Sequence, residues 1–84
     1  MPIKSDTFPC DYYIPLTNDT FREGRITVNR LSDHFYLEVD IVQKDSRKIF
    51  YHIGVFDCPK ELDFQEALDY GHQKMAHFLR SISD

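Results

Sequence analysis

The stretch Phe35-Tyr36-Leu37-Glu38-Val39-Asp40-Ile41-Val42 decides the fold class of this chain. Its side chains fall into two alternating sets: Phe35, Leu37, Val39 and Ile41 in one, and Tyr36, Glu38, Asp40 and Val42 in the other. Successive side chains of a β-strand point to opposite faces of its sheet, so the alternation predicts a strand with an apolar inner face and a more polar outer face.

A second strand is predicted upstream, over residues 25–30. The four residues 31–34 would then connect the two strands as a hairpin. This connection places Val28 opposite Leu37 and Ile26 opposite Val39, so the apolar faces of the two strands coincide.

A third strand is predicted over Ile49-Phe50-Tyr51-His52-Ile53-Gly54-Val55-Phe56, which is apolar on both faces and cannot fix its own register. A three-residue loop, 44–46, keeps Ile49, Tyr51, Ile53 and Val55 inward, whereas a two-residue loop turns Phe50, His52 and Phe56 inward. We prefer the three-residue loop because it leaves no histidine in the core. Its consequence is an aromatic outer face.

A helix is predicted over residues 63–82. Asp63 as N-cap with Glu66 three positions later is a variant of the capping box. Apolar or small residues then recur every three or four positions, at Phe64, Ala67, Leu68, Gly71, Met75, Phe78, Leu79 and Ile82. A glycine inside a helix costs about 1 kcal/mol relative to alanine, which suggests that a bulky ring such as Tyr51 needs room at Gly71.

These elements predict a single α+β domain over residues 1–84: a three-stranded antiparallel meander over 25–56 followed by one C-terminal helix packed on one face. Residues 1–24 form a proline-punctuated arm, in which residues 12–16 could add a fourth strand at the sheet edge. Two arrangements of the arm stay open. It either folds over the outer face of the sheet or leaves that face to a partner.

Composition limits the class of protein. The 84 residues are 42% hydrophobic and carry a formal net charge of -4, which is typical of a folded globular chain and opposes a general attraction to phosphate backbones. Two cysteines make no disulfide framework, and no apolar run is long enough for a signal peptide or a membrane span. We therefore expect a cytoplasmic protein with reduced thiols.

No motif in the chain indicates catalysis or a cofactor. His72 and His77 are five positions apart and cannot share a ligand sphere on one helix face, so no metal site is expected. The acid, imidazole and phenol groups that catalysis could use converge only at Tyr36, Glu38, Asp40 and His52. A small enzyme with a site around His52 is one alternative function, but the expected protein is not an enzyme.

The aromatic outer face predicts a protein-interaction module, such as an accessory subunit, a regulator or an inhibitor of phage or plasmid type. The candidate interface consists of Tyr36, Glu38, Asp40, Phe50, His52 and Phe56. Its apolar centre and charged rim are typical of an interface, and its partner would be another protein or a second copy in a homodimer. The acidic helix is a second candidate contact surface.

Nucleic-acid binding is a further alternative. Three strands precede a helix, and Ile-Gly-Val-Phe-Asp, residues 53–57, leads into the Glu-Ala-Leu of residues 66–68. This order, over residues 25–80, resembles the arm-type DNA-binding domain of phage integrases and the plant AP2 domain. The resemblance implies a sheet docked in the major groove. Those domains line the sheet with Arg, Lys and Trp, whereas Glu38 and Asp40 stand here, and the nearest basic cluster is Lys44, Arg47 and Lys48.

Overall fold

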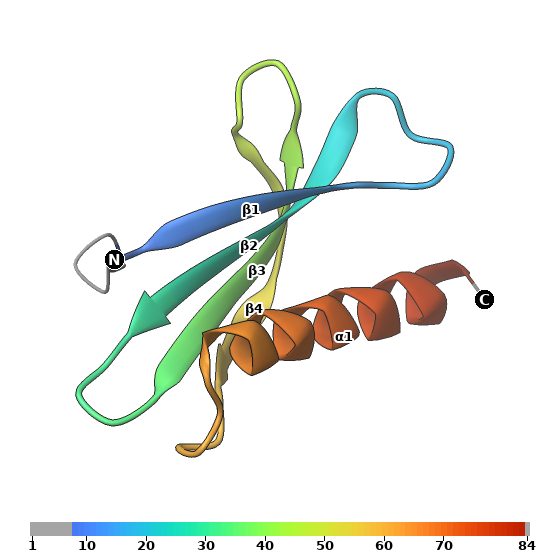
Figure 1. Ribbon diagram of the computed structural model, residues 1–84. Coiled ribbons are helices and arrows are strands. Elements are labelled where there is room, and N and C mark those ends of the chain that lie inside the picture. Colours follow the sequence, from blue (N-terminus) through green and yellow to red (C-terminus); the bar gives the residue numbers. More distant parts are fainter. Residues whose placement is uncertain (1–7, 84) are drawn as a thin grey trace.

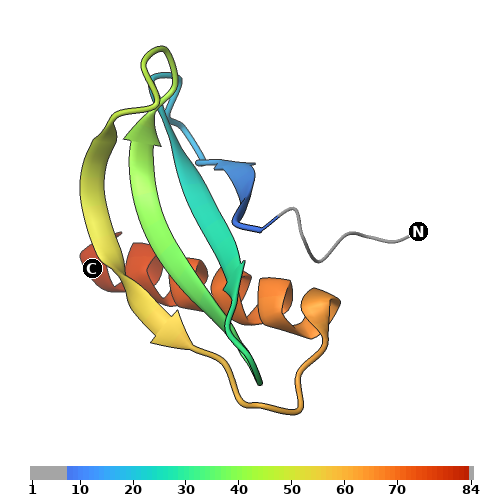
Figure 2. The ribbon, with the colours of Figure 1, turned by 90° about the vertical axis from the view of Figure 1, so that its left-hand side faces the viewer.

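A four-stranded antiparallel sheet carries one helix on a single face (Figures 1 and 2). The computed structural model describes residues 8–83. The elements are β1 (Cys10–Pro15), β2 (Arg22–Arg30), β3 (Phe35–Gln43), β4 (Ile49–Asp57) and α1 (Phe64–Ser83). The strands lie in chain order, and the predicted α+β meander followed by a helix is confirmed in its four-stranded form.

The hairpin of β2 and β3 has the register that its apolar pattern predicts. Val28 lies opposite Leu37 and Ile26 opposite Val39, and all four side chains are fully buried. The turn is closed by the Leu31 amide, which donates to the carbonyl of His34 at 2.9 Å. This hairpin forms the centre of the core.

The arm joins the sheet instead of covering its outer face. β1 pairs with β2, placing Tyr12 beside Ile26 and Ile14 beside Gly24, so both side chains point to the helix face. Phe8 lies on the same side, and its ring centroid is 5.8 Å from that of Phe35 and 5.9 Å from that of Phe64. The sheet therefore begins at Cys10, well before the predicted residue 25.

The helix begins at the predicted capping box. Asp63 accepts a hydrogen bond from the Glu66 amide at 2.8 Å, and Glu66 accepts one from the Asp63 amide at 2.9 Å. Gly71 faces the sheet, and a Cβ there would lie 2.8 Å from Cγ2 of Ile26. The expectation that Tyr51 occupies this space is wrong. Tyr51 stacks on Phe78 instead, with centroids 5.1 Å apart.

The predicted register of β4 is correct only near its middle. The loop contains residues 44–47, with Val42 opposite Ile49, so Ile49 points outward. The register then shifts twice. Each shift is an irregularity of the β-bulge type, in which β4 has one residue more than β3. Phe50 is the additional residue between the pairs Val42–Ile49 and Ile41–Tyr51, and Ile53 is the additional residue between the pairs Asp40–His52 and Val39–Gly54. Tyr51 and His52 lie as predicted, whereas Ile49, Val55 and Phe56 lie on the opposite faces, because a strand that is apolar on both sides does not resist a shift.

Among the residues that the structure describes, no helix combines the length and apolar character needed to cross a bilayer.

Candidate functional site

The centre of the outer face holds a buried ionic row across three strands. The register places Arg25 of β2 and His52 of β4 on either side of Asp40 of β3. The carboxylate of Asp40 is fully buried, lies 2.7 Å from His52 Nδ1, and accepts a hydrogen bond from Arg25 Nη2 at 3.1 Å. A buried carboxylate is costly without such partners, and the hydrogen bonds of this row compensate for its burial.

Arg25 is fixed by the same environment. Burial favours a lower pKa for its guanidinium, but the hydrogen bond and charge of Asp40 and the hydrogen bond of Tyr13 outweigh it, so the pKa of Arg25 is raised. Arg47 lies over the Tyr13 ring at 3.9 Å and 3.5 Å from Glu23. Arg25 and Arg47 therefore both have interaction partners within the chain.

The outer face is polar, and the predicted aromatic patch does not form. Tyr36, Glu38, Asp40 and His52 do come together there, and the Tyr36 hydroxyl accepts a hydrogen bond from Asn29 at 3.0 Å. The other two predicted members lie elsewhere. Phe56 packs against the core with Lys74 5.1 Å from its ring, and Phe50 lies beside Arg22 at 4.5 Å. The two register shifts in β4 moved them.

Three donor atoms on this face are close enough to share a cation. One ligand atom each of Glu38, Asp40 and His52 lies within 4.8 Å of the others. However, Arg25 already supplies the positive charge that Asp40 needs, and its guanidinium would repel a divalent ion bound at the same carboxylate. The arrangement acts as an internal ion network, and nothing else in it indicates a metal centre.

Most of the exposed large apolar side chains lie on β4, an edge strand, apart from Phe21 and Leu31. Ile49, Phe50, Tyr51 and Val55 are each 50–57% exposed. α1 packs mainly on β2 and β3, and it touches β4 where Phe78 stacks on Tyr51 and Lys74 lies over Phe56. The sequence contained a signal for this surface, because a strand that is apolar on both faces and ends a meander has no later strand to cover it.

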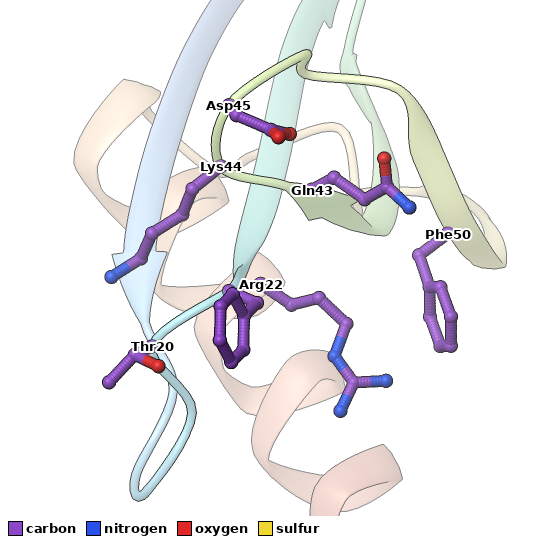
Figure 3. A pocket seen from close by; sticks show the side chains of 7 residues that line it. Thr20, Arg22, Gln43, Lys44, Asp45 and Phe50 are labelled. Atoms are coloured by element: carbon purple, nitrogen blue, oxygen red, sulfur yellow. The ribbon is translucent and has the colours of Figure 1, made fainter.

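Two hollows adjoin the first half of β4. One, of about 620 Å³, lies on the helix side and is lined mainly by Leu16, Arg22, Ile41, Phe50, Tyr51, Phe78 and Leu79. The other, of about 410 Å³, lies beside the tip of the β3–β4 hairpin, where the side chains of Arg22 and Phe50 face a common space (Figure 3). Phe50 lines both hollows, so strand edge and hollows form one surface.

The remaining predicted surfaces are partly engaged within the chain. Of the basic cluster, Arg47 lies on Tyr13 and near Glu23, while the Lys44 amide donates to the Phe21 carbonyl at 2.8 Å. On the acidic helix, Glu66 serves as part of the cap, and Gln65 donates to Asp69 at 3.2 Å. Arg47 of the basic cluster and Glu66 and Asp69 of the helix are therefore engaged within the chain.

Buried Cys58 shows the chemistry of a structural thiol. Burial, together with the charge of Asp57, raises the pKa of Cys58, which lowers the fraction of reactive thiolate.

No protein family, curated protein or solved structure is matched by this chain.

Proposed function

We propose that the chain is a non-enzymatic protein-interaction module, acting as an accessory subunit, regulator or inhibitor, whose contact surface is the β4 edge. The observation that supports this proposal most is that one edge strand carries four large apolar side chains that are each about half exposed: Ile49, Phe50, Tyr51 and Val55. Exposed apolar surface marks interaction sites on folded proteins, and here it borders both sides of one strand edge, with Ile49 and Val55 on the outer face and Phe50 and Tyr51 on the helix face.

The backbone of β4 supports this proposal. An edge strand presents unpaired N–H and C=O groups, which can hydrogen-bond an added strand, and side chains on the two faces then give specificity. Proteins usually protect such edges with prolines, charges or short strands. β1 at the other edge has those features, since it spans six residues and contains Asp11 and Pro15. β4 has nine residues and no charge before Asp57.

The alternatives receive less support. An enzyme site around His52 would need Asp40 as a working base, but Arg25 and His52 hold this carboxylate in a buried network. A sheet docked in DNA would place Glu38 and Asp40 toward the phosphates, and Arg25 is already paired. If DNA binding at ~150 mM salt appeared and weakened on neutralising Lys44, Arg47 and Lys48, the DNA alternative would replace our proposal.

Site-specific photo-crosslinking in the native host tests the proposal. A photoreactive phenylalanine analogue replaces Val55, and the matched control carries it at Leu31, which is 45% exposed in the β2–β3 turn. We expect discrete crosslinked protein products from position 55 and none of comparable yield from position 31. Equal yields, or none at position 55, would refute β4 as the contact surface.

A further inference from the structure

We infer that the strand added to β4 is β4 of a second copy, in an antiparallel pairing around a two-fold axis at His52. This inference rests on the proposed function and names its partner. The two four-stranded sheets would then form one continuous sheet.

The order of faces along β4 carries the inference. Because of its two register shifts, Ile49, His52 and Val55 point outward, whereas Tyr51 and Gly54 point to the helix face. Ile53 packs against the core, and Phe50 lines the helix-side hollow, so both belong to the helix face too. Residues 49, 52 and 55 therefore point outward, and residues 50, 51, 53 and 54 point to the helix face.

This order is the same in both directions about His52. A second copy that runs antiparallel places Ile49 opposite Val55, Phe50 opposite Gly54 and Tyr51 opposite Ile53, so like faces meet at every position. A regular strand has this property about any of its residues. β4 keeps it despite its two register shifts, because the inward-facing residues 50–51 and 53–54 lie symmetrically on either side of His52. The irregular β4 therefore matches β4 of a second, antiparallel copy.

The pairs that result are chemically complementary. Ile49 and Val55, each about half exposed, form an apolar cross-strand pair on the outer face. On the helix face, the exposed ring of Phe50 comes opposite Gly54 of the second copy, where the ring of that copy's own Phe56 lies against the glycine, so two aromatic rings meet at this position. Residues 49–56 contain no Asp, Glu, Lys or Arg, so the paired strands bring none of these charges together.

The area of this interface is compatible with a stable dimer, and its two-fold symmetry limits the assembly to two copies. The four exposed side chains contribute on the order of 100 Å² each, roughly half of the ~800 Å² per partner of a standard interface, before backbone and hollow are added. α1 ends behind β4 in Figure 2, so two helices would share one face of the joined sheet. Pairing β4 with β1 would instead propagate an open chain, and Pro15 opposes it.

Sedimentation of the purified protein over a range of concentrations tests the self-association. We expect a concentration-dependent dimer, and Val55→Lys should raise its dissociation constant about tenfold or more because two lysines would enter the apolar contact. The control Leu31→Lys adds the same charge in the β2–β3 turn, outside β4, and should leave the dimer unchanged. Equal effects of the two variants would overturn the inference.

Cysteine pairing tests the register. Ile49→Cys and Val55→Cys are made separately in a Cys10→Ser background and oxidised either alone or mixed. The pairing places residue 49 beside residue 55 of the other copy and separates the two like cysteines, so only the mixture should form a disulfide-linked dimer efficiently. Linkage of either variant alone at an equal rate would refute this register.

Failure of this inference is distinguishable from failure of the proposed function. A monomer at all concentrations, with crosslinks to a different protein from position 55 in the host, would overturn the second copy as partner and retain β4 as the contact surface. A monomer without such crosslinks would overturn both.

Discussion

The Asp40 carboxylate and the Arg25 guanidinium form an ion pair on the sheet face away from the helix, with Oδ2 and Nη2 3.1 Å apart. Asp40 is fully buried and 17% of the Arg25 side chain is exposed. The pair, together with His52, forms an internal network at the centre of the outer face.

Removing one partner of this pair should be costly. Asp40→Asn keeps the shape of the side chain but leaves Arg25 as a largely buried charge without its counter-ion, so we expect a loss of about 3 kcal/mol or more in the free energy of unfolding. Urea denaturation measures it. Glu38→Gln, at the partly exposed neighbour, is the control and should change stability by about 0.5 kcal/mol or less. Equal effects would show that Arg25 does not depend on Asp40.

Gly71 should not tolerate a large side chain. Its substituent would start 2.8 Å from Ile26 Cγ2 and 3.3 Å from Leu37 Cδ1, so Gly71→Leu overpacks the helix–sheet contact. We expect a net loss of about 2 kcal/mol even after the roughly 1 kcal/mol that glycine costs in a helix is recovered. The control is Ala76→Leu on the exposed side of α1. Denaturant stability unchanged in Gly71→Leu would contradict this packing.

The two phenylalanines that the sequence places on one face should respond differently. Phe50 is 54% exposed, so Phe50→Ser should leave the melting temperature of the monomer nearly unchanged. Phe56 packs against the core beneath Lys74, so Phe56→Ser should cost about 2 kcal/mol or more. Thermal melting at a concentration where the protein is monomeric separates the two, and similar losses for both would contradict the register of β4.

His34 should make stability depend on pH. Hydrogen bonds to Asp33 at 2.7 Å and Asp57 at 3.2 Å raise the pKa of His34, because both carboxylates favour its protonated form. This contribution is fully present below the unfolded-state pKa of about 6.5 and is lost as pH rises through the higher folded-state pKa. The melting difference between the parent protein and His34→Gln should therefore shrink from about pH 6 upward, and a constant difference would contradict it.

The sequence alone determined the elements whose patterns have one solution. The strict alternation of residues 35–42 and the four-residue connection before it dictate the register of β2 on β3, because any shift by one residue would expose the apolar set. Asp63 and Glu66 likewise determine the start of α1, since the capping box is a local interaction. Such signals depend on neighbours in the chain.

Only the tertiary structure decided where β4 places its side chains. Both of its faces are apolar, so burial favours neither register, and the two shifts that turn Val55 outward and Phe56 inward depend on how β4 fits against β3 and α1. The burial of Asp40 also required the assembled sheet, because its partners Arg25 and His52 come from two other strands. Local pattern determines an element when one face must be hidden; when both faces are alike, packing decides.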